Sequence, residues 1–310
     1  MILTNKLSLG KKMKYLYIGI IMLIALVCAY FFIPKVISDT IQVKSSCKIQ
    51  TLRRLVYNQN NVTSSLEDIK YTLKMDDFGN PVIIIDLQSK QIYLTLNNFQ
   101  SASNDDMIMG SYTLHSGKNK FEKIKNYYLN YKIKSKLKDI IQKIGSNCED
   151  LKNAYGGEIT KTNLMDSTLI YTKTVTDSFP TITEIYTKIQ LLEKYAVSNG
   201  AKSTNHPMLN IRKVSAEDIK YEFSVALPIN KDLQPNGNIV PKRMLAGGKF
   251  LTTTVKGGFR NVAKMELNLE NYLSDYTYSS PAIPFQSLVT NRFDHKDSTQ
   301  WVTKLYYPIF

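Results

Sequence analysis

The sequence predicts an α+β protein with an N-terminal transmembrane helix, a first α+β domain and a C-terminal domain of two βαββ units. Three observations predict this order. Residues 15–34 are apolar and uncharged, residues 36–155 mix alternating and helical patterns, and residues 156–310 repeat one pattern at an offset of eighty positions (308 − 228). A chain of 310 residues, 43% of them hydrophobic, is long enough for two such domains.

The first predicted element is a membrane anchor. Residues 1–14 form a basic tail, and the twenty uncharged residues of 15–34 match a hydrocarbon core of about 30 Å at about 1.5 Å per residue. Positive flanks stay in the cytoplasm, so the sequence predicts a single-pass protein whose later domains lie on the periplasmic side. A cleaved signal peptide is the alternative. A lipoprotein cleavage site would need a small residue before Cys28, where Val27 stands, and no small-x-small signal-peptidase site follows the apolar run. Both observations favour an uncleaved anchor.

Residues 36–155 are expected to form the first α+β domain. Residues 36–44 alternate as a strand does, and residues 47–57 fit a short helix. Several strand-like runs follow in residues 68–96, and residues 134–155 carry one apolar helical face. Strand, helix, several antiparallel strands and a final helix is the order of a helix-grip fold.

Three cysteines are too few for a disulfide scaffold. Cys28 falls in the predicted anchor, so Cys47 and Cys148 are the one pair that could bridge. Spacing in sequence carries no information on distance, so the pairing stays open, with two free thiols slightly favoured.

Residues 158–229 and 240–309 are the two predicted βαββ repeats. Their last strands, residues 219–229 and 299–309, both alternate and both close on Pro-Ile, where proline ends a strand without leaving a ladder donor unpaired. The other matched segments are the strands 169–175 and 249–255, the helical stripes beginning at Ile182 and Val262, and the short strands 209–212 and 289–292. Pairing the two units side by side would bury both apolar faces and leave a groove between them.

Residues 156–310 resemble the GyrI-like effector-binding domain, found in AraC-type and MerR-type regulators and as a free-standing module. The resemblance lies in the paired units, in Leu245-Ala246-Gly247-Gly248-Lys249, in Gly257-Gly258-Phe259 and in Tyr306-Tyr307-Pro308-Ile309. It implies binding of a small amphipathic or lipophilic molecule. The family commonly has a carboxylate just before the closing run, and Lys304 stands there, which points to anionic or neutral ligands.

Residues 36–155 resemble a degenerate SRPBCC (START-like) domain, which some bacterial proteins join to an effector-binding domain behind an anchor. The segment Phe32-Ile33-Pro34-Lys35 before Val36 resembles their junction. The tryptophan-rich segment of that family is absent, because Trp301 is the one tryptophan of the chain.

Strand parity selects the candidate binding residues. The apolar face of each strand is expected to lie under the helices, so the opposite face, with Glu222, Ser224, Lys304 and Tyr306, is expected to line the groove. A shift of one residue in strand register would exchange the two faces. The full candidate set for ligand binding is Tyr221, Glu222, Ser224, Arg292, Trp301, Lys304 and Tyr306. A pairing of Lys304 with Glu222, or a solvated Lys304, is the alternative for that lysine.

The sequence gives no metal site, cofactor or catalytic residue. Its three histidines lack ligand spacing, and no nucleophile elbow or phosphate-binding glycine loop appears. The net charge of +14 comes from lysines spread over the chain, so no nucleic-acid partner is predicted. Two alternatives to a binding protein remain, a hydrolase with Glu222 as base and Tyr306 polarising the substrate, or a protein-interaction module with a vestigial groove. The oligomeric state is left open.

Overall fold

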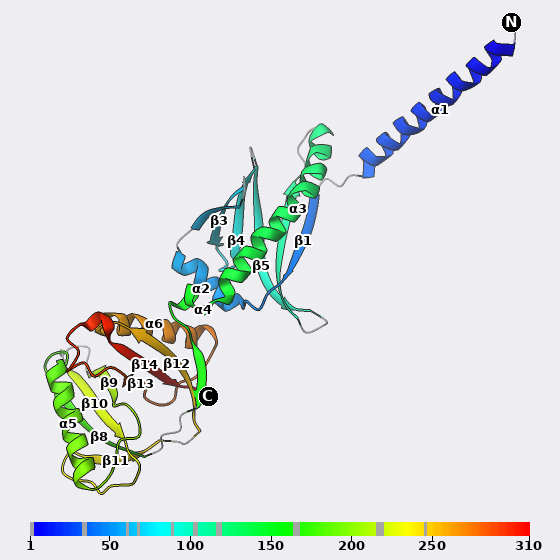
Figure 1. Cartoon of the computed structure of the whole chain (residues 1–310). Coiled ribbons are helices and arrows are strands. Elements are labelled where there is room, and N and C mark those ends of the chain that lie inside the picture. Colours follow the sequence, from blue (N-terminus) through cyan, green and yellow to red (C-terminus); the bar gives the residue numbers. More distant parts are fainter. Residues whose placement is uncertain are drawn as a thin grey trace. The chain divides into compact units, whose positions relative to one another are not determined.

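The computed structural model describes residues 3–32, 36–59, 62–66, 69–87, 90–101, 105–115, 120–163, 168–214, 220–244 and 247–310. In these residues the chain is α+β, as predicted, with six α-helices and two antiparallel sheets (Figure 1). It divides into two compact units, Met1–Glu149 and Asp150–Phe310, each with its own sheet.

The first helix, α1 (Leu3–Phe32), contains most of the run predicted to cross a membrane. Within the described part of the chain, however, no helix combines the length and the apolarity that a membrane crossing requires. This finding overturns the predicted transmembrane helix at residues 15–34 and the single-pass location that rested on it. The helix joins the lysine-bearing segment 6–14 to the apolar run, and Ile33, Pro34 and Lys35 of the predicted junction lie outside the described residues.

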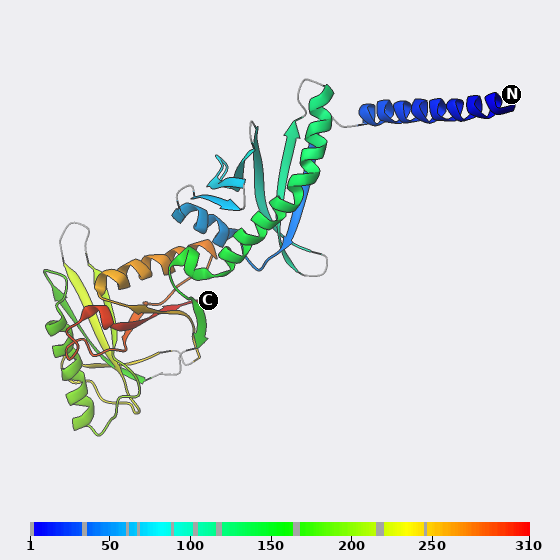
Figure 2. The ribbon, with the colours of Figure 1, turned by 45° about the horizontal axis from the view of Figure 1, so that its top comes forward.

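Unit 1 is a six-stranded antiparallel sheet with two helices packed against it (Figure 2). The strand order is β1-β6-β5-β4-β3-β2. The elements are β1 (Val36–Lys44), α2 (Ile49–Gln59), β2 (Val62–Leu66), β3 (Ile69–Met75), β4 (Pro81–Leu87), β5 (Lys90–Gln100), β6 (Asp106–His115) and α3 (Lys120–Glu149). Helix α3 contacts β1 and β6, and α2 contacts β3.

The core of unit 1 follows from the apolar stripe of α3. Its buried residues Ile133, Leu137, Ile140, Ile141 and Ile144 recur at helical spacing and pack on the inward side chains of the sheet. The single helix predicted over residues 134–155 is two. It breaks at Asp150, whose carboxylate accepts a hydrogen bond from the Lys152 N–H at 3.0 Å and so begins α4 (Leu151–Tyr155).

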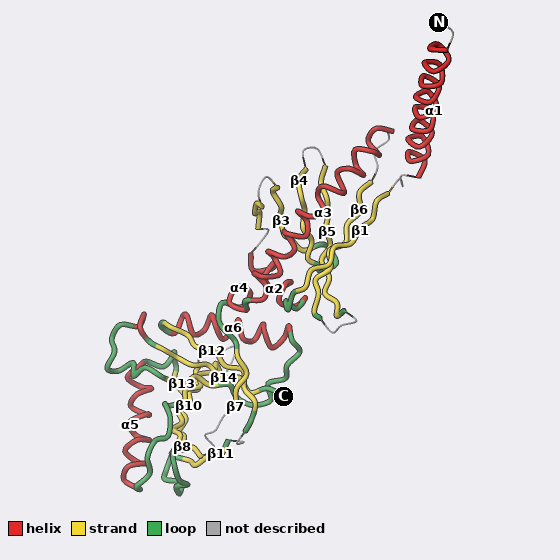
Figure 3. Tube along the Cα trace, turned by 45° about the vertical axis from the view of Figure 1, so that its right-hand side comes forward, coloured by secondary structure: helices red, strands yellow, loops and turns green. Residues whose placement is uncertain are grey.

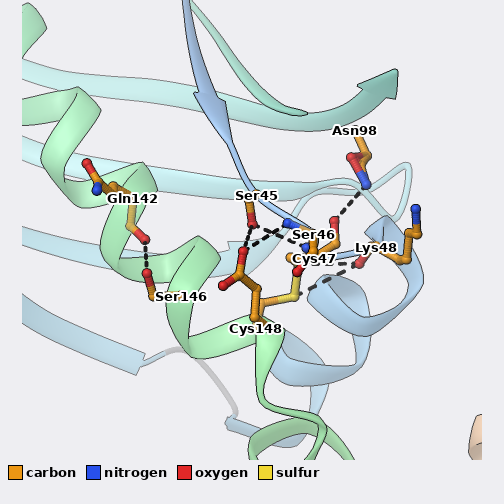
Figure 4. The surroundings of a disulfide bond; sticks show 9 residues. Ser45, Ser46, Cys47, Lys48, Asn98, Gln142, Ser146 and Cys148 are labelled. Carbon is orange, nitrogen blue, oxygen red and sulfur yellow. Dashed lines mark hydrogen bonds between the residues drawn. A yellow bond between two sulfur atoms is a disulfide. The ribbon is translucent and has the colours of Figure 1, made fainter. Parts of the chain in front are cut away.

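A disulfide bond joins Cys47 and Cys148, whose Cα atoms are 5.4 Å apart (Figure 4). The slight preference for two free thiols was therefore wrong. Tertiary packing brings the segment before α2 against the last turn of α3, a closeness that spacing in sequence does not reveal. Both cysteines are almost completely buried, and Glu149 accepts hydrogen bonds from Ser45 Oγ (3.0 Å) and the Ser46 N–H (2.9 Å) beside them.

Removing this disulfide should destabilise unit 1 alone. The bridge closes a loop with a sequence separation of 101 residues, and its loss restores chain entropy to the unfolded state, so the Cys47→Ala/Cys148→Ala variant should lose about 2–5 kcal/mol. Circular dichroism in urea reports on both units, whereas Trp301 fluorescence reports on unit 2, which contains that residue. The control is Cys28→Ala, at the free cysteine. An unchanged circular dichroism transition in the double variant would contradict the prediction.

Unit 2 holds an eight-stranded antiparallel sheet of order β11-β8-β10-β9-β13-β14-β12-β7. Its remaining elements are β7 (Thr160–Asn163), β8 (Thr168–Thr176), α5 (Ile182–Ser198), β9 (Met208–Lys213), β10 (Tyr221–Pro228), β11 (Val240–Arg243), β12 (Lys249–Lys256), α6 (Phe259–Asp275), β13 (Phe285–Leu288), the 3-10 helix η1 (Ser298–Gln300) and β14 (Val302–Pro308). The order strand, helix, strand, strand occurs twice. The two sets meet where β9 pairs with β13. Figure 3 shows the strands of this unit together with helices α5 and α6.

Two predicted strands differ from the structure near the C-terminus. Residues 289–292 are not a strand, because the strand of that unit, β13, ends at Leu288. The last strand begins at Val302 rather than Thr299, because the Asp297 carboxylate accepts a hydrogen bond from the Thr299 N–H at 2.9 Å and bends residues 298–300 into η1.

Helices α5 and α6 cover one face of this sheet. On β10 the buried side chains Phe223, Val225 and Leu227 belong to one core cluster with Ile189 and Leu192 of α5. Helix α6 makes the corresponding contacts with β12 and β14. Side chains alternate between the two faces of a strand, so the intervening residues of β10 point to the uncovered face. The site lies on that face.

Glu266 of α6 gives unit 2 a pH-dependent stability. Burial raises the pKa of Glu266 above its ordinary value of 4.5, and Glu270 adds to the rise, while a 3.0 Å hydrogen bond from Gln286 opposes it. The folded state therefore holds this proton more tightly than the unfolded state. The contribution of Glu266 to stability is therefore fully present below pH 4.5 and is lost as the pH rises through its raised folded pKa.

Glu266→Gln should raise the melting temperature of unit 2 at pH 7 and flatten this part of its pH dependence, because the amide resembles the protonated carboxyl. Thermal melting followed by Trp301 fluorescence between pH 4 and pH 8 measures both the melting temperature and its pH dependence. The matched control is Glu193→Gln on the exposed side of α5. A variant less stable than the parent at pH 7 would show that the carboxylate is stabilising.

Candidate ligand-binding cavity

A cavity of about 830 Å³ opens on the uncovered face of the unit 2 sheet. This volume lies within the roughly 300–1,000 Å³ of small-molecule sites. Strands β8, β9 and β10 supply most of its floor, and the segments leading into β12 and β13 and the end of the chain supply its walls. Its lining residues are Leu169, Tyr171, Lys173, Met208, Leu209, Asn210, Arg212, Glu222, Ser224, Ala226, Lys242, Arg243, Met244, Gly247, Gly248, Lys249, Phe250, Ala282, Ile283, Phe285, Pro308, Ile309 and Phe310.

The floor of the cavity is apolar where three strands lie in register. Ala226 of β10 is opposite both Tyr171 of β8 and Met208 of β9, and the three side chains share the open face. Ala226 is small, so it leaves depth between its larger neighbours. One wall is tied to the floor, because Asn210 Nδ2 donates a hydrogen bond to the Pro284 carbonyl at 2.9 Å.

A charged cluster lies beside this floor and is centred on Glu222. Arg212 is directly opposite on β9, and its Nε and Nη2 atoms lie 2.9 and 2.8 Å from Glu222 Oε1. Lys173 Nζ of β8 lies 3.7 Å from Glu222 Oε2. The Glu222 side chain is 15% exposed, against 60% for Arg212 and 63% for Lys173. Glu222 is thus held between two cations whose outer surfaces face solvent.

Three more basic side chains line the cavity from the β11 side and the start of β12. Lys242 Nζ lies over the Tyr171 ring at 5.5 Å from its centroid. Arg243 forms an ion pair with Asp232, and Lys249 has no ion-pair partner among the described residues. The lining therefore carries five basic side chains and one acidic side chain, so the formal charges of its side chains sum to a positive value.

Of the seven predicted binding residues, the cavity lining contains Glu222 and Ser224. Lys304 and Tyr306 are on β14, whose partner β13 lies next to β9. The Tyr306 ring stacks on Phe285 at 4.9 Å, and Lys304 Nζ lies 5.3 Å from the centre of the Tyr306 ring. Lys304 therefore neither lines the cavity nor pairs with Glu222, whose ion pairs are with Arg212 and Lys173.

Tyr221, Trp301 and Arg292 lie away from the cavity. Tyr221 packs edge-on against Phe179 at 5.6 Å. Trp301 is 4% exposed and donates its indole N–H to the His295 carbonyl at 2.7 Å. Tyr221 and Trp301 occupy positions whose side chains point to the helix-covered face, so both contribute to the packing on that face.

Arg292 is a buried cation of the core. It is 3% exposed, its guanidinium lies over the Phe259 and Trp301 rings at 4.7 and 5.3 Å, and it donates to Thr303 Oγ1 at 2.7 Å. Burial lowers the pKa of this guanidinium. Its Nε and Nη1 atoms have no hydrogen-bond partner among the described residues, so the guanidinium is held by the Thr303 hydrogen bond and by the two aromatic rings.

The sequence reasoning missed the basic and apolar residues that share the open face with Glu222. Arg212 and Lys173 are two of them, and Tyr171 and Met208 are two more. A parity argument applied to β8 and β9 as well as β10 would have selected them, because each alternates along its own strand with an apolar residue of the helix-covered face, such as Ile170 or Leu209. Register is a tertiary property, so the pairing itself was not visible.

The structure does not bring together Glu222 and Tyr306, the base and the polarising group of the hydrolase hypothesis. Glu222 on β10 and Tyr306 on β14 are three strand spacings apart, about 14 Å. Tyr306 is also outside the lining, so the two side chains do not meet at one substrate atom. The described residues contain no cluster of ligands that could hold a metal ion.

Comparison with known proteins gives structural neighbours. The C-terminal domain of EcmrR is 15% identical with a TM-score of 0.42, over 50% of this chain and 98% of that domain. SAV2435, solved bound to tetraphenylphosphonium, is 13% identical with a TM-score of 0.33, over 49% and 94%. A hydrolase from Listeria innocua is 11% identical with a TM-score of 0.34, over 53% and 98%.

No protein-family model matches the chain, and neither does any curated protein sequence. Identities of 15% and less, with TM-scores below 0.5, establish neither a family nor a ligand for this chain. The resemblance of residues 36–155 to SRPBCC domains finds no support in these comparisons.

Proposed function

We propose that residues 156–310 form a GyrI-like domain that binds a small amphipathic molecule in the cavity on the open face of its sheet, without chemistry. The observation that carries the proposal is the cavity itself. It combines an apolar floor around Ala226 with a charged cluster at Glu222, so it offers separate surfaces to the two ends of an amphiphile.

The two alternatives agree less well with the geometry. A hydrolase needs a base and a polarising group at one substrate atom, whereas Glu222 is engaged by Arg212 and Tyr306 is about 14 Å away. An interaction module with a vestigial groove was expected to have a filled groove, and this groove is open. The absence of a nucleic-acid partner stays a prediction from the sequence.

The proposal is tested by blocking the cavity. Ala226→Trp places an indole between Tyr171 and Met208, so it should abolish binding of any amphiphile that the parent protein binds. Native mass spectrometry of the full chain, followed by thermal shift with decanol, decanoate and decylammonium below their aggregation concentrations, gives the ligand. A ligand present at a hundred times its Kd should stabilise the parent by about 2.7 kcal/mol.

The matched control is Thr254→Trp. Thr254 is exposed on β12 of the same sheet and is outside the cavity lining. Lys304→Gln is a second control, because Lys304 is outside the lining too. Binding that survives Ala226→Trp but is lost in a control variant would place the site elsewhere, and a parent protein indifferent to every amphiphile would refute the proposal.

A further inference from the structure

We infer that the ligand of this cavity carries an acidic head group, a carboxylate or a phosphate, and that Glu222 competes with that head group for Arg212 and Lys173. The inference rests on the proposed function, because it specifies the chemistry of the molecule bound there. Three features of the lining carry it.

The first feature is the balance of charge. Five basic side chains line the cavity, and Glu222 is the one acidic side chain among the lining residues. A cationic amphiphile entering this space would meet a surplus of like charge, whereas an anion would meet attraction from several directions. Lys242 and Lys249 have no ion-pair partner among the described residues, and they add positive charge to the lining from the side of β11 and from the start of β12.

The second feature is the state of Glu222. A cationic ligand would need this carboxylate, but Glu222 is only 15% exposed and Arg212 already contacts it at 2.8 and 2.9 Å. Binding a ligand cation at Glu222 would therefore require giving up an existing charge-assisted contact. Arg212 and Lys173 are about 60% exposed, so each has an open side for an anion, and that anion would share their positive charge with Glu222.

The third feature is the position of the cluster relative to the apolar floor. Along β10, Glu222, Ser224 and Ala226 follow one another on the open face, at a rise of about 3.4 Å per residue. A head group at Arg212 and Lys173 would thus have Ser224 next to it and Ala226 beyond. The tail would lie over the apolar floor formed by Tyr171, Ala226 and Met208.

The competition predicts a substitution with opposite effects for the two signs of ligand. Glu222→Gln removes the carboxylate that shares Arg212 and Lys173, so decanoate should bind about fivefold more tightly. A ligand cation that depended on Glu222 would bind more weakly in the same variant. Arg212→Gln should weaken decanoate binding by about fivefold and weaken decanol binding by a smaller factor, because the alcohol carries no charge.

The experiment is isothermal titration of the full chain with decanoate, decyl phosphate, decanol and decylammonium, which share one tail and differ in the head. Decanoate or decyl phosphate should bind more tightly than decanol, and decylammonium more weakly. The tighter of the two acids identifies the head as carboxylate or phosphate. Added salt should reduce the advantage of the acids over decanol, because it screens exposed charges.

Several outcomes would overturn the inference. Decanol binding as tightly as both acids would refute the acidic head group while leaving the proposed binding function intact. Decylammonium binding more tightly than decanol, with a loss in Glu222→Gln, would assign Glu222 as a cation receptor. No binding of any probe would refute the inference together with the proposed function. Lys304→Gln, outside the lining, checks that an effect is local to the cavity.

Discussion

The pairing of β9 with β13 is the contact on which the structure of unit 2 depends. It joins two sets of strand, helix, strand and strand into one sheet, with Gln286 opposite Leu209 and Ser287 opposite Met208. Each set alone would leave an apolar sheet face and an apolar helix stripe partly exposed. Because α5 and α6 cover the same face, the opposite face is left open along the middle of the sheet. The cavity is a consequence of this one-sided cover.

Electrostatics then determine what that open face can hold. A glutamate on β10 is directly opposite an arginine on β9, and a lysine on β8 completes the cluster, so the one acidic side chain of the lining already has two cationic partners. The other basic residues come from segments that close the cavity from the side of β11 and β12. The resulting surplus of positive charge is a property of the assembled sheet, since no single segment of the sequence contains it.

Unit 1 is held by a different kind of constraint. Its long helix α3 packs an isoleucine and leucine stripe on the sheet, and the disulfide between Cys47 and Cys148 ties the end of that helix to the segment before α2. Burial of apolar side chains and the disulfide therefore both hold α3 against the rest of unit 1. The apolar stripe provides the packing, and the disulfide limits the freedom of the unfolded chain.

The local elements and the inward face of each strand could be predicted from the sequence, because both follow from periodicity along a few residues. The alternation around Phe223 and Val225 and the stripes of α3, α5 and α6 are of this kind. Only the tertiary structure decided which strands are neighbours. That is why Lys304 and Tyr306, chosen by parity, are not in the cavity, while Arg212 and Lys173 are.

The same distinction explains the remaining differences. Arg292 and Trp301 looked like binding residues because they are polar or aromatic and near the last strand, and packing between Phe259 and Thr303 buries them instead. The proximity of Cys47 to Cys148 depends on the path of α3 across the sheet. Distances between segments far apart in the chain arise from packing, and a pattern read along one segment does not contain them.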